Sequence, residues 1–419
     1  MQAPSNLSLQ IKRNFRPETV SLLETIGKEG AKLDTYIYLV GGAVRDLLRG
    51  ATTRDLDLVS ESDGIKLAGV LANAIKGEVI ATSEFGTARI AMPGIKFDVV
   101  TARRESYKRP GALPIVEPGS IQDDLARRDF AVNAMALHLH PDCFGDIEDP
   151  FQGRNDLKLK RLRSLHPKSF IDDPTRILRA IRYEERLGVR MDTKTATLAQ
   201  DHSHHLGGVS GDRIRKEIEN IFQEPLPESC FSRAQTLGIL TTISPGLLWD
   251  MSITKSLFQV REAQIYIEPL YFLAFLCLRM DSWDASAFCD RVNAPSKWRH
   301  VITGTADVLS KIPELSKLNL KHSEIDQLLK AIDETAINAL SLLQRERPAG
   351  LRLKLYTESL RNIRPSLDGR DLINLGSRVP VDRKRLLDDL RGAILDGVIQ
   401  GREEEIRWIR EQLQERRER

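Results

Sequence analysis

The spacing of hydrophobic and polar residues changes partway along the chain. Between Tyr36 and about His140, short apolar runs such as "YIYLV", "LDLVS" and "KFDVVTA" appear, and some alternate with period two, which is typical of β-strands. The segments "GAVRDLLRG" and "DGIKLAGVLANAI" have helical spacing instead. Beyond about residue 150 the strand signals fade and helical patterns continue to the end. The pattern therefore predicts the α+β class, with a mixed N-terminal head followed by a long helical part.

The composition narrows the class of protein without deciding its function. The chain has 419 residues, of which 41% are hydrophobic and 29% are charged, as expected for a globular protein of several domains. Lys and Arg number 62, yet the net charge is only +3, so a basic surface for nucleic acid would require segregated charges. The four cysteines show no CxxC spacing, and no signal peptide or membrane-spanning run is visible. We therefore expect a cytoplasmic protein without a membrane segment.

The segment "LVGGAVRDLLRGATTRDLDLVS" (39–60) begins with a turn suited to phosphate. Gly41 and Gly42 follow a predicted strand and precede a predicted helix, where the backbone can approach a ligand closely. The free N–H groups of a helix start can donate to phosphate oxygens. Arg45, in the first helical turn, could add a charge-assisted contact to the same phosphates.

A pair of aspartates ends the same segment. Asp55 and Asp57 lie at i and i+2 on a predicted strand, so both carboxylates project from one face. Two carboxylates this close repel each other unless a cation lies between them, and such oxygen ligands suit Mg²⁺, which also bridges phosphates. Asp98 offers a third carboxylate on what reads as a neighbouring strand. Three acids around two metal ions would activate a hydroxyl group and neutralise a pyrophosphate leaving group.

Each of these features alone has a simpler interpretation. A GG pair is usually only a turn, and a DxD pair is usually a solvated strand edge. Here the two occur in order and are joined by one short predicted helix. Their combination favours nucleotidyl transfer.

The segment "DDPTRILRAIRYEERLG" (172–188) is predicted to form a helix that selects a base. Asp173, Arg176 and Arg179 recur at i, i+3 spacing and so line one face. A carboxylate only accepts hydrogen bonds, whereas a guanidinium only donates them. Cytosine and adenine both present an amino donor beside a ring-nitrogen acceptor, so Asp173 and Arg176 would accept C or A and reject U and G. Each mismatch would leave a polar group unpaired, at a cost of about 1–3 kcal/mol.

The same segment also fits an ordinary charged amphipathic helix. In that interpretation Asp172 caps the helix and Pro174 lies in its first turn. Arg182 and Arg186 continue the basic row. They could meet a triphosphate or merely pair with Glu185, and both interpretations stay open.

These motifs, in this order, resemble the signature of the DNA polymerase beta superfamily. Within it, the chain is similar to the class II (bacterial-type) tRNA nucleotidyltransferases and the bacterial poly(A) polymerases. Two further segments carry the resemblance: "DDLARRDFAVNAMAL" (123–137) is similar to the family motif RRDFTINA, and "DIEDPFQGRNDLKLKRLR" (146–163) is similar to the connection between head and neck. The match covers about residues 36–190. The loop "KRPGALPIVEP" and the tail turn "SRVPVDRKRL" depart from the usual family wording.

The resemblance implies a fold and a division into domains. It implies a DNA polymerase beta-like nucleotidyltransferase head with a small mixed sheet, followed by an all-helical neck, body and tail. We place the catalytic head at residues 1–145 and the neck, with the nucleotide-selecting helix, at 146–210. The helical body would cover 211–345 and the tRNA-binding tail 346–419.

The resemblance also assigns roles to individual residues. The implied catalytic residues, which are also the implied ligands of Mg²⁺, are Asp55, Asp57 and Asp98. Arg128 is expected at the triphosphate, with Asp129 and Asn133 near the ribose, although these residues alone indicate only a basic pair at the edge of an element. The expected nucleotide-binding residues are Gly41, Gly42, Arg45, Arg128, Asp129, Asn133, Asp173, Arg176, Arg179 and Arg182.

The implied activity is template-independent addition of C, A or both to the 3′ end of tRNA. The substrates would be CTP and ATP, pyrophosphate would be released, and the body and tail would bind the acceptor stem and elbow of tRNA by shape and phosphate contacts. No protein partner is implied. A poly(A) polymerase acting on RNA 3′ ends is the alternative, and an inactive RNA-binding protein is disfavoured because all three acids are present. Whether the enzyme adds CCA, only CC or only A stays open.

Overall fold

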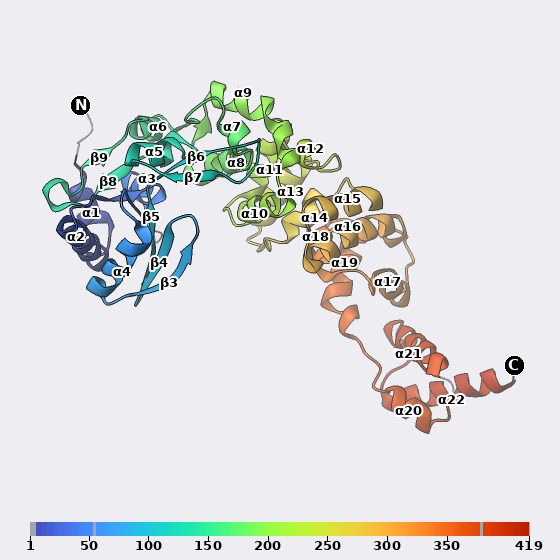
Figure 1. Cartoon of the computed structure of the whole chain (residues 1–419). Coiled ribbons are helices and arrows are strands. Elements are labelled where there is room, and N and C mark those ends of the chain that lie inside the picture. Colours follow the sequence, from blue (N-terminus) through green and yellow to red (C-terminus); the bar gives the residue numbers. More distant parts are fainter. Residues whose placement is uncertain (1–5, 53–55, 378–379, 419) are drawn as a thin grey trace. The chain divides into compact units, whose positions relative to one another are not determined.

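A computed structural model provides the structure of the chain (Figure 1). It describes residues 6–52, 56–377 and 380–418. Over these ranges no helix combines the length and the apolar character that a membrane crossing requires. The chain divides into two compact units, residues 1–217 and 218–419. The predicted division into head, neck, body and tail is finer than this and stays a prediction.

One mixed sheet organises the first unit. Its order, over the described residues, is β3-β4-β5-β2-β1-β8-β9. The strands are β1 (Ile37–Val40), β2 (Leu56–Ser60), β3 (Glu78–Ser83), β4 (Thr87–Met92), β5 (Ile95–Thr101), β8 (Ala136–His138) and β9 (Ile147–Glu148). Strands β2 and β5 run parallel, whereas the other neighbouring pairs run antiparallel. The predicted small mixed sheet is therefore confirmed.

The two faces of the sheet are covered by different helices. One face, which includes Leu58 and Val99, packs into a core with α1 (Ser8–Asn14), α2 (Pro17–Lys32), α3 (Gly42–Leu48) and α4 (Gly64–Ile75). The other face, which includes Val40 and Val59, packs against α5 (Ile121–Ala126). Side chains alternate between faces along a strand, so Asp57 shares the face of Val59 and lies opposite to Leu58. This alternation places Asp57 on the face opposite to the larger core.

The rest of the first unit carries a hairpin and a series of helices. The hairpin pairs β6 (Arg103–Ser106) with β7 (Ile115–Pro118), and a short parallel pair joins β10 (Arg161–Leu162) to β11 (Arg190–Met191). The helices are α6 (Gly153–Lys158), α7 (Ser169–Asp172), α8 (Thr175–Leu187), α9 (Thr193–Asp201) and α10 (Gly211–Phe222). The hairpin and α8 are the elements that complete the site.

The predicted helix over 172–188 begins later than expected. Helix α8 starts at Thr175 after an N-cap Pro174 that makes no side-chain cap bond, and Asp172 ends the preceding helix α7. The interpretation of Asp172 as the cap of this helix is therefore wrong. Instead, the Thr175 N–H donates to the Asp173 carboxylate at 3.1 Å, because the extended backbone of Asp173 turns its side chain back toward the helix start.

The described part of the second unit contains helices and no strand. Its helices are α11 (Pro227–Thr236), α12 (Leu240–Ile243), α13 (Met251–Glu262), α14 (Tyr271–Leu276), α15 (Ser282–Arg291), α16 (Ser296–Leu315), α17 (His322–Leu329), α18 (Glu334–Leu343), α19 (Pro348–Glu358), α20 (Gly369–Asn374), α21 (Pro380–Leu395) and α22 (Arg402–Glu418). Helix α14, from the most apolar run of the chain, is buried. The tail helices share a small core around Leu372 and Leu390.

Candidate active site

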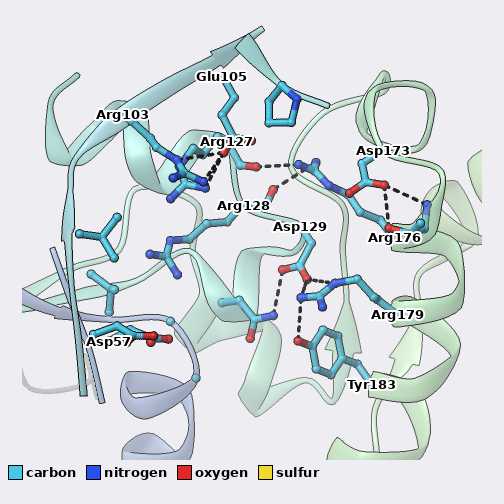
Figure 2. A pocket seen from close by; sticks show the side chains of 18 of the residues that line it. Asp57, Arg103, Glu105, Arg127, Arg128, Asp129, Asp173, Arg176, Arg179 and Tyr183 are labelled. Atoms are coloured by element: carbon cyan, nitrogen blue, oxygen red, sulfur yellow. Dashed lines mark hydrogen bonds and ion pairs between the residues drawn. The ribbon is translucent and has the colours of Figure 1, made fainter. Parts of the chain in front are cut away.

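A pocket of about 830 Å³ opens in the first unit (Figure 2). The end of β1, the start of α3, strands β2 and β5, the β6–β7 hairpin and α8 all contribute to its walls. The expected site residues that line it are Gly41, Gly42, Arg45, Asp57, Asp98, Arg128, Asp129, Asn133, Asp173, Arg176 and Arg179. Arg182 is not among the lining residues, and Asp55 lies outside the described residues.

The glycine turn forms one wall of the pocket. Gly41 has φ +68° and ψ −125°, a backbone conformation that side-chain-bearing residues rarely adopt. A Cβ atom at Gly41 would lie 2.5 Å from Nη1 of Arg128, so the missing side chain also leaves space for that guanidinium. At Gly42, by contrast, the nearest atom to an added Cβ would be Nη2 of Arg45 at 3.6 Å, an ordinary contact.

Two of the three aspartates predicted to bind metal, Asp57 and Asp98, lie on adjacent strands. Asp57 of β2 is the register partner of Asp98 of the parallel strand β5. Neighbouring strands are about 5 Å apart, so the two residues start close together on one face. Asp98 accepts two hydrogen bonds from Arg89, Nε at 2.7 Å and Nη2 at 2.8 Å. Two carboxylates side by side form a donor set that suits a divalent cation, with Arg89 as a competing internal partner.

The "RRDF" segment is held by buried acids. Asp124 on α5 is 0% exposed and accepts hydrogen bonds from Arg127, at 2.6 Å, and from Arg128, at 2.8 Å. Burial raises the pKa of Asp124, but the two guanidiniums outweigh it, so its pKa lies below the ordinary Asp value. The carboxylate therefore stays charged and fixes both arginines at the pocket.

A chain of polar contacts connects the glycine-turn helix to α8. Arg45 donates through Nη1 to the Asn133 amide oxygen at 2.7 Å, and Asn133 donates to Oδ1 of Asp129 at 2.9 Å. The other oxygen of Asp129 accepts from Arg179 at 2.7 Å, and Arg179 donates to the Tyr183 hydroxyl at 3.1 Å (Figure 2). Burial raises the pKa of Asp129, whereas Arg179 and Asn133 lower it, and the net pKa lies below the ordinary value.

Tyr183 is surrounded by positive charge. The guanidiniums of Arg45, Arg179 and Arg182 lie 5.7, 5.5 and 5.4 Å from the centre of its ring. The aromatic face partly compensates their mutual repulsion through cation–π attraction. Arg182 thus belongs to the wall behind the pocket, where it also lies 3.8 Å from Glu217.

Asp173 and Arg176, which are expected to read the base, are each held in place by hydrogen bonds to neighbouring residues. Oδ1 of Asp173 accepts from the Thr175 hydroxyl at 2.7 Å and from Nη2 of Arg213 at 2.7 Å. Arg176 donates to the Ser169 hydroxyl at 2.8 Å and to the main-chain oxygen of Arg127 at 2.7 Å. Both side chains line the pocket from the start of α8. The structure therefore brings an acceptor and a donor together at this wall.

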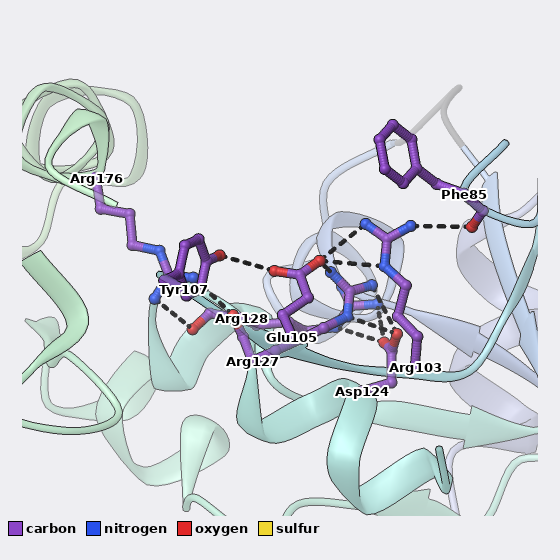
Figure 3. A network of polar contacts seen from close by, with 8 residues as sticks. All are labelled: Phe85, Arg103, Glu105, Tyr107, Asp124, Arg127, Arg128 and Arg176. Carbon is purple, nitrogen blue, oxygen red and sulfur yellow. Dashed lines mark hydrogen bonds and ion pairs between the residues drawn. The ribbon is translucent and has the colours of Figure 1, made fainter. Parts of the chain in front are cut away.

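None of the predicted site residues lies on the β6–β7 hairpin, although Arg103, Glu105 and Tyr107 line the pocket. Glu105 is only 6% exposed in its side chain and accepts from Arg103 at 2.9 Å, from Arg127 at 2.9 Å and from the Tyr107 hydroxyl at 2.8 Å (Figure 3). Burial, followed by the charge of Glu105, raises the pKa of Tyr107. The alternation of Arg103, Glu105 and Tyr107 with period two was the available signal. Arg213, which also lines the pocket, was not among the predicted site residues either.

The fold and this pocket define a nucleotidyltransferase with a polymerase-type head. Residues 37–163 match the family described as the poly A polymerase head domain, and residues 188–250 match a family described as a probable RNA and SrmB-binding site of polymerase A. The chain belongs to the class II tRNA nucleotidyltransferase and poly(A) polymerase family. The predicted fold and enzyme class are thereby confirmed.

Individual relatives cover different shares of the chain. An A-adding tRNA nucleotidyltransferase of Halalkalibacterium halodurans is 34% identical over 414 residues, which cover 97% of this chain and 95% of that protein. One of Geobacter sulfurreducens is 32% identical over 416 residues, covering 95% of this chain and 47% of that protein. A CC-adding tRNA nucleotidyltransferase of Deinococcus radiodurans is 35% identical over 239 residues. These residues cover 57% of this chain and 63% of that protein.

Solved structures of CCA-adding enzymes match nearly the whole length of this chain. A CCA-adding enzyme in apo form II has a TM-score of 0.85 at 28% identity and covers 98% of this chain and 99% of its own. The Thermotoga maritima CCA-adding enzyme complexed with tRNA has a TM-score of 0.79 at 27% identity. The match covers 99% of this chain and 100% of that enzyme's chain. The prediction of C or A addition to tRNA 3′ ends is confirmed at the level of the family.

Proposed function

We propose that this enzyme adds the terminal A to tRNAs that already end in CC, with ATP as the donor. The observation that carries this choice is the similarity, over nearly the whole chain, to an A-adding enzyme of almost the same length. The family-level activity covers C and A alike, so the restriction to A is the proposal. In this proposal CTP is a poor substrate of the enzyme.

Asp173 and Arg176 would accept adenine and reject guanine and uracil, whereas cytosine fits the same two contacts, so the preference for ATP over CTP requires a further determinant. The contacts of Asp173 with described residues all fall on Oδ1, so Oδ2 is left to accept from the exocyclic amino group of the base. Arg176 uses Nη1 and Nη2 in its contacts with described residues, and Nε is left to donate to a ring nitrogen. Guanine and uracil would present a carbonyl oxygen to the carboxylate and an N–H group to the guanidinium, so both contacts would fail.

The triphosphate would be bound by the glycine turn and its arginines. Gly41 leaves space for Arg128, and Arg45 starts the polar chain that ends at Arg179. Asp129 and Asn133 hydrogen bond to each other in the wall of the pocket, which supports a role near the ribose. Because Arg182 does not line the pocket, we assign it to support of Tyr183 rather than to nucleotide contact.

The family uses divalent metal ions, and we propose that Mg²⁺ is the ion here. Asp57 and Asp98 would hold it, because their register positions are paired on one face, and Asp55 would complete the predicted set. When bound, Mg²⁺ supplies a Lewis acid beside the attacking 3′ hydroxyl and charge compensation for the pyrophosphate. The chain itself positions the triphosphate and excludes wrong bases.

The acceptor substrate would be tRNA, bound through the acceptor stem and elbow. The match of residues 188–250 to an RNA-binding family supports an RNA surface on the helices that follow the pocket. Double-helical RNA is read mainly by its shape and phosphates, which fits helices without a sequence-reading motif. The assignment of tRNA binding to residues 346–419 and the cytoplasmic location both stay predictions.

Product analysis on three tRNA substrates tests the restriction to A. Transcripts that lack CCA, CA or only A would be incubated with ATP, with CTP and with both, and the products sequenced. We expect one A to be added to the CC end and no extension of the two shorter transcripts. Addition of C to a shorter transcript would contradict the proposal. Runs of A on an unrelated RNA would instead favour a poly(A) polymerase.

A further inference from the structure

We propose that Arg213 is a positioning residue that determines base specificity, because it fixes the orientation of the Asp173 carboxylate. Arg213 lies on α10, outside the predicted site, and reaches the same pocket. The inference rests on the proposed role of Asp173 as the acceptor for the amino group of the base. Arg213 itself would not contact the nucleotide base.

Arg213 joins two parts of the pocket wall. Its Nη2 donates to Oδ1 of Asp173 at 2.7 Å, and its Nη1 donates to the main-chain oxygen of Gly111 at 3.1 Å. Gly111 lies in the loop between β6 and β7 and has φ +70°. A Cβ atom at Gly111 would be 3.2 Å from the Val209 side chain, so the loop packs closely where Arg213 crosses it. Both terminal nitrogens of the Arg213 guanidinium are thus held by hydrogen bonds.

The contacts of Arg213 decide which carboxylate oxygen faces the base. Oδ1 of Asp173 accepts from the Thr175 N–H, the Thr175 hydroxyl and Arg213, whereas Oδ2 accepts no hydrogen bond from a described residue. The terminal torsion of an aspartate is broad and close to two-fold, so packing alone does not fix it. With one oxygen saturated by three donors, the other is the acceptor that remains for an amino group.

A fork-shaped donor is needed for this position. A guanidinium presents several N–H donors in a fixed plane, so Arg213 can hold the Gly111 oxygen and Asp173 at the same time. An ammonium group is a compact charge at the end of a flexible chain and would not bind both acceptors with the same geometry. Lysine would therefore keep the charge beside Asp173 and lose the orientation.

The variants Arg213→Ala and Arg213→Lys test this role, with Arg215→Ala as the matched control. The Arg215→Ala variant removes the same charge from the same helix, where Arg215 forms an ion pair with Asp212 at 2.7 Å. The measurement is kcat and KM for ATP, CTP, GTP and UTP on tRNA ending in CC. We expect Arg213→Ala to lower the preference for ATP over GTP in kcat/KM about tenfold, since one mismatch penalty is weakened. Arg213→Lys should recover only part of this preference, and Arg215→Ala should keep all of it.

Two further measurements separate positioning from loss of structure. The melting temperature and the tRNA dissociation constant of Arg213→Ala should match those of Arg215→Ala. If Arg213→Ala folds poorly, Thr175→Val removes one donor to Oδ1 and should shift the preference in the same direction by a smaller factor. An equal loss of rate for all four nucleotides, with the ATP preference intact, would overturn the inference. Addition of C by the wild type would contradict only the restriction to A, because discrimination against G and U would still test Arg213.

Discussion

At the scale of single residues, buried carboxylates decide where the positive charges of the pocket lie. Asp124 fixes Arg127 and Arg128, and Asp129 fixes Arg179. A buried charge without a partner is strongly destabilising, so these acids and arginines depend on one another. The site is therefore assembled before a nucleotide arrives.

Replacement of Asp124 by Asn should destabilise the first unit by about 3 kcal/mol at neutral pH, because two guanidiniums lose their shared carboxylate. The pKa of Asp124 is lowered in the folded state, so its contribution is present above the ordinary Asp value and is lost as the pH falls through the folded value. The difference in melting temperature between wild type and variant should thus shrink in acid. A constant difference from pH 7 to pH 3 would contradict this account.

Replacement of Gly41 by Ala should lower kcat/KM for ATP by more than tenfold while the tRNA dissociation constant stays unchanged. The backbone conformation at Gly41 costs a residue with a side chain about 1–3 kcal/mol, and the new methyl group would displace Arg128. Gly42→Ala is the comparison, because its Cβ has only ordinary contacts. Similar losses in the two variants would show that neither the conformation nor the Arg128 contact is responsible.

At the scale of elements, the β6–β7 hairpin is connected to helix α8 through Glu105. Glu105 holds Arg127, and the main-chain oxygen of Arg127 accepts from Arg176 at 2.7 Å. Glu105→Ala should therefore reduce kcat/KM for ATP about tenfold with little change in tRNA binding, because the hydrogen bonds from Arg103, Tyr107 and Arg127 to its carboxylate are lost. Glu117→Ala on the exposed part of β7 is the matched control and should have no effect. Steady-state measurement of kcat/KM for ATP in Glu105→Ala and Glu117→Ala tests this expectation, and equal values for the two variants would contradict it.

Elements with a regular local pattern were predictable, and elements set by distant contacts were not. The short strands and the helical remainder followed from periodicity, the small mixed sheet was implied by the family resemblance, and the paired positions of Asp57 and Asp98 agree with adjacent strands. The start of α8 was misplaced because Asp173 precedes Pro174 and adopts the extended backbone that the residue before a proline favours, a local rule that the helical spacing alone does not include. Arg213 is 40 residues from Asp173 along the chain, so only the folded structure reveals their contact. The predicted role of Asp55 lies outside the described residues.

At the scale of the whole molecule, the residues that line the candidate active site all belong to the first unit, whereas the match to the RNA-binding family spans residues 188–250. Binding of tRNA through its phosphates would release counterions, so the logarithm of the association constant should fall linearly with the logarithm of the salt concentration. Fluorescence titration of labelled tRNA between low and physiological salt measures the slope. A dissociation constant that is independent of salt would contradict phosphate-based recognition.

The ion pair between Arg89 and Asp98 has a consequence for how the site is charged. Arg89 is 54% exposed in its side chain, and exposed ion pairs contribute only about 0–1 kcal/mol. Arg89 offsets one of the negative charges of Asp57 and Asp98, so the acidic edge keeps a net negative charge. On the proposed role of Asp98, Mg²⁺ would compete with Arg89 for this carboxylate, and the ion would supply positive charge that the arginine alone does not.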